Sequence, residues 1–289
     1  MSRFRFVGDH ADQYSVKRLC RLVEVSRSGY YAWRARPVPE RLIADAFLAN
    51  EIRDIHARSR GTYGAPRILG QLRRSGYRVG KKRVARLMSE YRLVGAHTRR
   101  RWRRGHVDVA PAGDLLNRNF DVDAPNQAWV ADITEFVTDE GKLYLAGVRD
   151  LYSRTLVGWS MGTRATAELV IDALVMAVAR RNPEGPLVHH ADHGSQYTSI
   201  KFTNHLDDLG LVASYGSVGD AYDNAAMETF WATLKREIAW IYGTARFATQ
   251  MQLRTALFEY IEVFYNRERH QAALDHHTPS EFELIRSVA

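Results

Sequence analysis

The sequence predicts an α/β core that follows an all-helical region and precedes a helical tail. Residues 14–94 show helical periodicity, whereas from about Asn119 β-rich runs alternate with helical ones. The charge changes near the same place, because residues 1–118 hold 27 Lys and Arg against 10 Asp and Glu, and residues 119–289 hold 14 against 23. The net charges of +17 and −9 indicate a nucleic-acid-binding region joined to a different kind of domain.

The composition excludes several classes of protein. A chain of 289 residues that is 45% hydrophobic and 26% charged is typical of about two folded domains. The longest nearly apolar stretch, residues 169–178, is shorter than the ~18 residues that span a bilayer, so no membrane segment is expected. No apolar secretory signal is visible, and the single Cys20 excludes an internal disulfide or a cysteine zinc cluster. We expect a cytoplasmic protein.

The first segment, residues 1–40, has a helix-turn-helix outline. Apolar residues at helical spacing mark one helix and aromatic residues mark the next: Val16, Leu19, Leu22 and Val23, then Tyr30, Tyr31 and Trp33. Ser26 stands where it can cap the second helix. The same pattern fits an ordinary helical hairpin, and both interpretations stay open at this point.

A second helical region, residues 41–94, contains three expected helices. The first carries Ile43, Phe47, Ile52 and Ile55, the second follows Pro66 and ends at Gly76, and the third buries Val84, Leu87, Met88 and Tyr91. Four cations crowd the first turns of the third helix: Lys81, Lys82, Arg83 and Arg86. Because the helix dipole disfavours cations there, the pattern favours DNA contact over a merely solvated face.

Residues 95–118 lack sustained periodicity and are interpreted as a basic linker or arm that contacts nucleic acid. Five arginines surround Trp102: Arg99, Arg100, Arg101, Arg103 and Arg104. Residues 119–245 form the expected catalytic core, and residues 246–289 form the helical tail.

The core contains three β-rich runs followed by alternating helices and strands. Strands are expected at 127–138, 142–151, 154–162, 186–192 and 211–216, and helices at 165–181, 199–209 and 222–242. This order is that of a ribonuclease-H-like α/β domain.

Three acidic residues occupy positions suited to metal-dependent chemistry. Asp132 lies among apolar neighbours in the first strand, and Asp192 follows an apolar strand at the end where α/β sheets form ligand sites. Glu228 lies in the long helix, with 35 residues between it and Asp192. Two Mg²⁺ ions about 3.5–4 Å apart can activate the attacking oxygen and stabilise the leaving oxygen of a phosphodiester. Bound cations would also let an acidic domain approach phosphates.

The long helix places further polar groups beside Glu228. Asn224 and Lys235 lie four residues before and seven residues after it, so the three share roughly one face. We expect Lys235 to neutralise a DNA phosphate, although a solvated lysine gives the same pattern.

The motifs WVADIT, HHADHGSQY and YDNAAMETFWATLKRE, at this spacing, resemble the D,D(35)E core of bacterial insertion-sequence transposases of the IS-three family. That family is related to retroviral-type integrases. The segment SRGTYGAPRILGQLRRSGYRVGKKRVARLM is similar to the family's helix-turn-helix region. YIEVFYNRERHQAALDHHTPSEFE is similar to its C-terminal tail.

The resemblance implies that Asp132, Asp192 and Glu228 are catalytic ligands of two Mg²⁺ ions, for which Mn²⁺ can substitute. Lys235 matches the basic residue that the family carries in this helix. The implied reaction is cleavage at the element's ends, followed by attack of the freed 3′-OH on another strand. The implied partners are terminal inverted repeats, target DNA, further copies of the chain, and an upstream-frame product supplied separately or by frameshift fusion.

Two other functions remain open on the sequence alone. A ribonuclease-H-like nuclease would cut without joining strands, and a helix-turn-helix regulator would bind DNA without cutting it. His189, His190 and His193 suggest zinc, but consecutive strand residues point to opposite faces, so the first two cannot bind one ion. Asp150 is interpreted as a turn carboxylate rather than a fourth ligand.

Overall fold

The structure is a computed structural model that describes residues 3–37, 39–96, 122–192, 194–215 and 225–287. The chain divides into two compact units, residues 1–50 and 51–289. The finer division expected from the sequence, into residues 1–40, 41–94, 95–118, 119–245 and 246–289, stays a prediction. No helix in the described ranges is long and apolar enough to cross a membrane.

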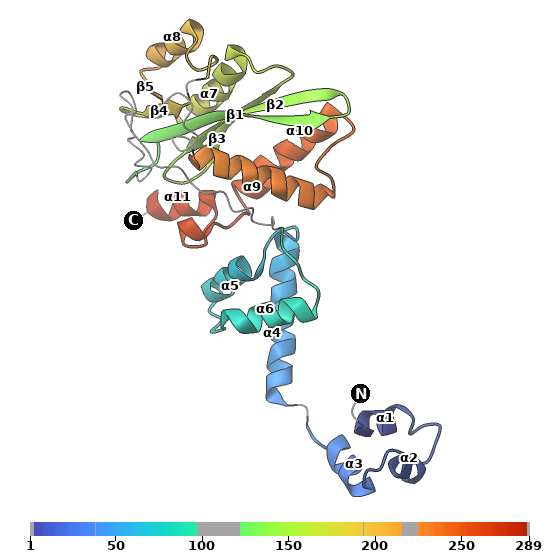
Figure 1. Ribbon diagram of the computed structural model, residues 1–289. Helices are drawn as coiled ribbons and strands as arrows, with labels where there is room; N and C mark the ends of the chain where they lie inside the picture. Colours follow the sequence, from blue (N-terminus) through green and yellow to red (C-terminus); the bar gives the residue numbers. More distant parts are fainter. Residues whose placement is uncertain (1–2, 38, 97–121, 193, 216–224, 288–289) are drawn as a thin grey trace, which may run out of the picture. The chain divides into compact units, whose positions relative to one another are not determined.

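The first unit contains α1 (Arg3–Asp9), α2 (Val16–Leu22) and α3 (Arg27–Arg34), drawn in blue in Figure 1. Ser26 caps α3 by accepting a hydrogen bond from the Gly29 N–H at 3.0 Å, as expected. Val7, Leu19, Cys20 and Tyr30 form the buried core. The sequence analysis did not foresee α1, whose short apolar run is interrupted by arginines.

The next helices are α4 (Glu40–Arg58), α5 (Ala65–Arg74) and α6 (Lys81–Glu90). Val84, Leu87 and Met88 are buried in α6, as predicted. The predicted burial of Tyr91 is wrong, because Tyr91 lies just beyond the last turn of α6 and is 41% exposed, with the Arg53 guanidinium over its ring.

The core is a five-stranded sheet in the order β3-β2-β1-β4-β5. Its strands are β1 (Ala128–Thr138), β2 (Gly141–Asp150), β3 (Leu156–Gly162), β4 (Val188–Ala191) and β5 (Val212–Tyr215). The first three pair antiparallel, while β4 pairs parallel with both β1 and β5. Four of the five strands lie within the ranges predicted from the sequence, and β2 begins one residue before its predicted range of 142–151.

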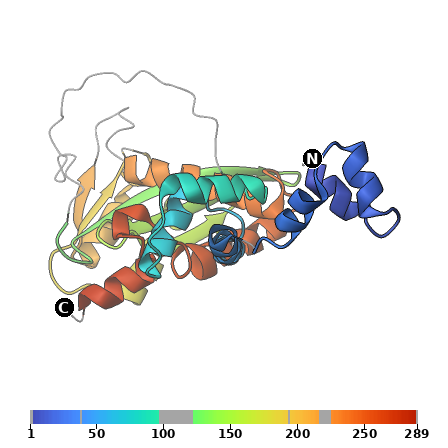
Figure 2. The same ribbon diagram turned by 90° about the horizontal axis from the view of Figure 1, so that it is seen from below.

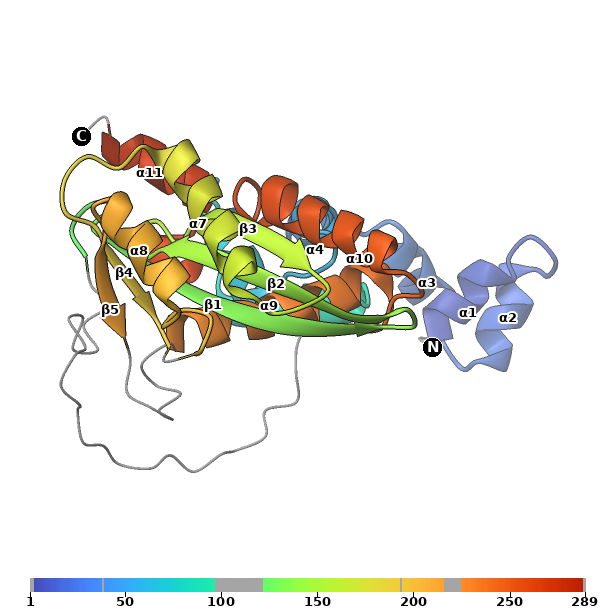
Figure 3. The same cartoon turned by 90° about the horizontal axis from the view of Figure 1, so that it is seen from above.

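Helices cover both faces of this sheet. The helices α7 (Ala167–Arg181) and α8 (Ile200–Asp208) lie on one face, which is nearer the viewer in Figure 3, and α9 (Ala225–Tyr242) lies on the other. The face under α7 and α8 buries Trp129, Val148, Leu174 and Phe202 in one apolar cluster. On the other face the Trp231 ring packs so closely on Gly147 that a Cβ there would lie 2.8 Å from it.

The tail consists of α10 (Gln250–Phe258), a π-helix, η1 (Glu259–Tyr265), a 3₁₀ turn, η2 (Ala272–Leu274), and α11 (Pro279–Ser287). Figure 2, seen from below, shows α5, α6 and α11 on the side of the sheet that faces away from α7 and α8. The predicted architecture is therefore confirmed: a helical region, a ribonuclease-H-like α/β core and a helical tail.

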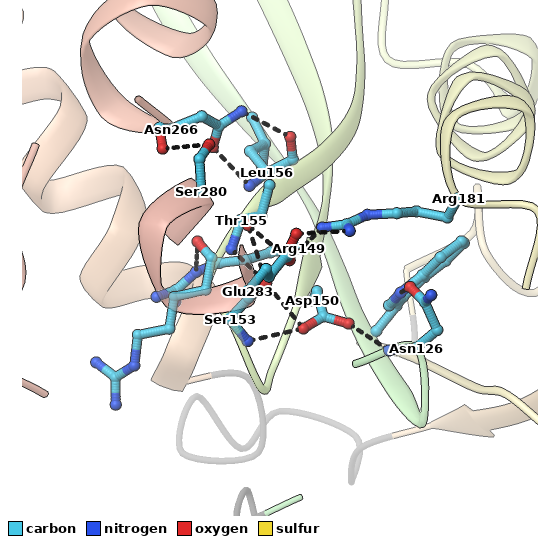
Figure 4. A network of polar contacts seen from close by, with 12 residues as sticks. Asn126, Arg149, Asp150, Ser153, Thr155, Leu156, Arg181, Asn266, Ser280 and Glu283 are labelled. Atoms are coloured by element: carbon cyan, nitrogen blue, oxygen red, sulfur yellow. Dashed lines mark hydrogen bonds and ion pairs between the residues drawn. The ribbon is translucent and has the colours of Figure 1, made fainter. Parts of the chain in front are cut away.

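A buried polar network joins the β2–β3 turn to the tail (Figure 4). Asp150 is fully buried and accepts hydrogen bonds from the Asn126 N–H at 2.8 Å and from the N–H and hydroxyl of Ser153 at 2.8 and 3.0 Å. Nearby, Glu283 of α11 accepts hydrogen bonds from Thr155 at 3.0 Å and Arg181 at 2.8 Å. These contacts confirm that Asp150 is a structural turn carboxylate.

Candidate active site

Strand register places Asp132 beside Asp192. In the parallel pair β1–β4, Ala131 lies opposite Ala191, so the next residue of each strand is an aspartate. Their backbones therefore leave the paired segment side by side, at the carboxyl end of β4, where α/β sheets form ligand sites. Asp132 is partly buried, whereas Asp192 is exposed and accepts a hydrogen bond from the Gly194 N–H at 3.1 Å.

Helix α9 brings the third carboxylate to the same edge of the sheet. Glu228 lies in its first turn and is exposed. Trp231 follows three residues later on the same face, and its indole N–H donates to Asp132 Oδ2 at 2.9 Å. This hydrogen bond fixes the start of α9 over β1, close to Asp132.

The charges of Asp192 and Glu228 both act on the Asp132 carboxylate. The pKa of Asp132 is raised to about 6, mainly because the carboxylate is desolvated, and the negative charges of Asp192 and Glu228 add to the rise. Hydrogen bonds from the Ile133 N–H, at 2.7 Å, and from Trp231 hold this pKa lower than it would otherwise be. Asp132 is thus an anion in need of a counter-charge.

A small cavity of about 210 Å³ lies between the two aspartates. Gln196 and Tyr197 line it together with Asp132 and Asp192. The Tyr197 hydroxyl is buried and has no hydrogen-bond partner in the described part of the chain. Burial and the charges of the two aspartates raise the Tyr197 pKa, so the neutral phenol keeps its proton as a donor.

The donor set fits magnesium, because all three side chains offer carboxylate oxygens and a divalent cation would offset the repulsion at Asp132. However, the part of the chain that the structure describes contains no group of three His, Cys, Asp or Glu side chains arranged to hold an ion. The three carboxylates therefore lie within electrostatic reach of one another but not in ligating geometry. Holding a shared ion would require them to approach more closely.

Lys235 lies on the same side of α9 as Trp231. Its exposed ammonium lies 5.2 Å from the centre of the Phe136 ring. Desolvation lowers its pKa, and the charges of Glu135 and Asp132 oppose that change. The cation is therefore close enough to the carboxylates to act on them. Asn224 lies outside the described residues.

The predicted DNA-contact residues of α6 are displayed on its surface. Lys81 and Lys82 are exposed, Arg83 is partly exposed, and exposed Arg86 forms an ion pair with Glu90 at 3.2 Å. The first turn contains no acidic residue, and Gly80 provides no side-chain cap. The five arginines of the linker, Arg99, Arg100, Arg101, Arg103 and Arg104, lie outside the described residues.

The histidines of β4 belong to the core. His189 is buried against Tyr197 and Phe202, and burial lowers its pKa to about 4. His190 hydrogen-bonds through Nδ1 to the Ser214 hydroxyl at 2.9 Å on the neighbouring strand. His193 lies outside the described residues.

Two residues of the site escaped the sequence analysis. Trp231 lies on the helix face of Glu228, but its indole hydrogen bond goes to Asp132, which lies 99 residues earlier in the chain. Tyr197 belongs to the HHADHGSQY motif, and its only visible signal was proximity in sequence to Asp192. Sequence spacing alone predicts neither the hydrogen bond of Trp231 to Asp132 nor the place of Tyr197 in the cavity wall.

Known families match most of the chain. Residues 122–221 and 228–285 match two families described as "Integrase core domain", and residues 43–101 match an "HTH-like domain". The chain is 41% identical to the "Insertion element IS600 uncharacterized 31 kDa protein" of Shigella sonnei, over 91% of this chain and 97% of that one. It is 36% identical to "Transposase InsF for insertion sequence IS3A" of Escherichia coli strain K12, over 97% and 98%.

Among solved structures, the HTLV-2 integrase catalytic core in complex with magnesium is similar at 17% identity and a TM-score of 0.43, covering 55% of this chain and 97% of that one. The matched domains define an integrase-core transposase, a DDE-type polynucleotidyl transferase. The chain belongs to the IS3 family of insertion-sequence transposases.

Proposed function

We propose that this transposase cleaves DNA at the ends of its element and joins the freed 3′-OH to target DNA, using Asp132, Asp192 and Glu228 as ligands of two divalent cations. The observation that carries the proposal is the raised pKa of Asp132, to which the charges of Asp192 and Glu228 contribute. Asp132 lies within β1, Asp192 directly follows β4 and Glu228 lies in the first turn of α9, and the charges of the last two disfavour the Asp132 anion, so a cation bound there would stabilise it.

Each side chain has a distinct part in this proposal. The bound ions, Mg²⁺ or Mn²⁺, would supply an activated attacking oxygen and stabilise the leaving one. Trp231 orients the Asp132 carboxylate through its indole N–H, and Tyr197 offers its unpaired hydroxyl to a group entering the cavity. Lys235 places a cation where a scissile phosphate would lie beside the carboxylates.

DNA would reach this site through the basic helical region. The exposed cations of α6 suit the backbone or base edges of the terminal inverted repeats. Asn224 and the linker arginines are proposed as further contacts. We also propose that several copies assemble on the DNA, and that an upstream-frame product, separate or fused, contributes to the active complex.

The test replaces each acid with its neutral isostere, as Asp132→Asn, Asp192→Asn and Glu228→Gln. Labelled element ends are incubated with target DNA and Mg²⁺, and cut and joined products are separated. Each variant should lose at least 100-fold in strand transfer while keeping its folded circular-dichroism spectrum. Asp139→Asn, at an exposed residue of the β1–β2 turn, is the matched control and should retain activity.

The outcomes separate the proposal from its alternatives. A folded variant that still joins strands would remove that residue from the site. Cut ends without joined products from the wild-type chain would indicate a nuclease. DNA binding with no cleavage in either Mg²⁺ or Mn²⁺ would indicate a regulator.

A further inference from the structure

A second concave site, the arginine hollow, lies beside the first turns of α9. It has a volume of about 500 Å³ and is lined by Arg67, Arg149, Arg154 and Arg269. These residues come from α5, the end of β2, the β2–β3 turn and the segment after η1. None of the described residues that line it is acidic, although residues 119–289 carry an excess of acidic groups.

The buried carboxylate of Glu237 pairs with two arginines of this lining, Arg67 and Arg269. Glu237 is fully buried and accepts two hydrogen bonds from Arg269, at 2.7 and 2.8 Å, and one from Arg67 at 3.0 Å. Both cations therefore share one negative charge. Burial lowers the pKa of Arg67, and the repulsion from Arg269 lowers it further. The pair leaves one positive charge in excess.

Arg149 adds a second cation, and the described part of the chain places no carboxylate in an ion pair with it. Its side chain is almost completely buried, and its hydrogen bonds go to the carbonyl oxygens of Ala226 at 2.8 Å and Arg154 at 3.3 Å. Its guanidinium also lies 5.7 Å from the centre of the Phe230 ring. A buried cation without an anion is costly, so the fold holds a site that an anion would stabilise.

The hollow adjoins the catalytic carboxylates along α9. Its lining includes Ala225, Ala226 and Thr229, and Glu228 lies in the same turn. Successive helix residues are turned by about 100°, so the hollow and Glu228 occupy adjoining sides of one helix. A polynucleotide strand running along that turn would pass from the arginines to the carboxylates.

We propose that the arginine hollow binds a backbone phosphate of the DNA whose scissile bond lies at Asp132, Asp192 and Glu228. This inference rests on the function proposed above and adds a second anchoring point to it. Guanidinium groups suit this ligand, because their planar donors match phosphate oxygens and remain charged. One phosphate here would contact both the HTH-like domain, through Arg67, and the integrase core, through Arg149 and Arg154.

The test measures DNA binding in a background that cannot cleave, the full chain with Asp132→Asn. Fluorescence anisotropy with an element-end duplex is recorded over a range of salt concentrations, with Arg149→Gln or Arg154→Gln added. Each variant should weaken binding about 5- to 10-fold. Each should also reduce the slope of log K against log salt by about 0.9, the value for one phosphate contact. Arg246→Gln removes the same charge from an exposed arginine that pairs with Asp139, and should leave the slope unchanged.

A second pair of variants covers the chance that losing a buried arginine disturbs folding. Ala273→Glu adds an anion to the lining at an exposed position, and should weaken DNA binding without removing any arginine contact. Ala179→Glu adds the same charge on α7, across the sheet, and should have no effect. Unchanged affinity and slope in Arg154→Gln and Ala273→Glu, both folded, would overturn the proposal.

Inorganic phosphate distinguishes a free anion from the DNA backbone. If phosphate raises the melting temperature of the wild-type chain and not of Arg149→Gln, while DNA binding is equal in both, the hollow binds free phosphate and the proposal is wrong. Because the binding assay uses the Asp132→Asn chain, its result does not depend on cleavage. A reduced salt slope combined with a wild-type chain that cannot join strands would therefore contradict the proposed function and leave the hollow as a DNA site.

Discussion

Two carboxylates at helix α9 differ in their surroundings: Glu237, which lies in α9, and Asp132 of β1, which accepts a hydrogen bond from Trp231 of α9 and is the proposed metal ligand. Glu237 is fully buried, yet two arginines and the Tyr260 hydroxyl hold its pKa at about 2. Asp132 is less buried, yet desolvation raises its pKa to about 6, and the negative charges of Asp192 and Glu228 add to that rise where arginines oppose it at Glu237. Burial alone does not distinguish the two groups. The sign of the surrounding charge does.

The largest expected effect is the loss of the Glu237 charge. Glu237→Gln leaves Arg67 and Arg269 facing each other in a buried position, and breaking such a pair costs about 3–5 kcal/mol. Denaturant unfolding at pH 7 measures the change. Glu259→Gln, at an exposed carboxylate paired with Arg60, is the control and should cost less than about 1 kcal/mol. A Glu237→Gln chain as stable as the wild type would show that the network contributes no stability.

The pH dependence of stability should differ in sign between the two carboxylates. The folded pKa of Glu237 is about 2, below the ordinary value of 4.5 that it takes in the unfolded chain. Its contribution to stability is therefore complete above pH 4.5 and is lost as pH falls toward 2, by about 3 kcal/mol. The folded pKa of Asp132 is about 6, above the ordinary value of 3.8, so its penalty to stability is present above pH 6 and disappears as pH falls toward 3.8.

Unfolding free energies of the wild type and each variant, measured from pH 7 to pH 2, would separate these terms. The difference between wild type and variant is the useful quantity, because buried His189, with a pKa of about 4, also destabilises the wild type between pH 6.5 and 4. If the difference in unfolding free energy between wild type and variant changed with pH in the same direction for Glu237→Gln and Asp132→Asn, the two carboxylates would not have opposite effects on stability.

A smaller effect of opposite sign is expected from Asp132→Asn. Removing an anion that its neighbours disfavour should stabilise the metal-free chain at pH 7 by about 1–2 kcal/mol while abolishing strand transfer. Thermal unfolding with EDTA measures the gain. Added Mg²⁺ should then stabilise the wild type more than the variant, and equal stabilisation of both would argue against Asp132 as a ligand.

The smallest expected effect concerns the tuning of Asp132. Trp231→Phe removes a hydrogen bond that lowers the Asp132 pKa, so that pKa should rise above its present value of about 6. Carboxyl NMR titration measures it directly. Trp240→Phe changes an exposed tryptophan of the same helix and should leave the Asp132 pKa where it is.

The sequence predicted the sheet well because its strands have strong local patterns. Strand β1 is rich in aromatic and β-branched residues and is followed by a turn and then Gly141, whose φ of 118° favours glycine. Asp132, Asp192 and Glu228 were also proposed from the sequence, since motif and spacing single them out one at a time, and their role as ligands stays a prediction. How closely the three carboxylates approach one another could not be predicted in that way, because it depends on the register of β1 with β4 and on the packing of α9.

The arginine hollow was invisible in the sequence for a related reason. Its four arginines are spread from residue 67 to residue 269, each beside ordinary neighbours, and only the folded chain brings them together. Helix α1 escaped detection because its apolar residues alternate with arginines, which hides the face that packs on α3. Tertiary packing decides such cases, and periodicity carries little information about it.

The four residues of β4 impose a strict tolerance on changes in chain length. Sliding Val188–Ala191 by one position against β1 would exchange the sides to which His189 and His190 point, and would carry Asp192 to the wrong surface. Extra residues between Asn182 and Leu187, before the strand begins, can be absorbed by the connection. One residue inserted within the strand would move Asp192 away from Asp132 and Glu228, even though all three acidic residues would still be present in the sequence.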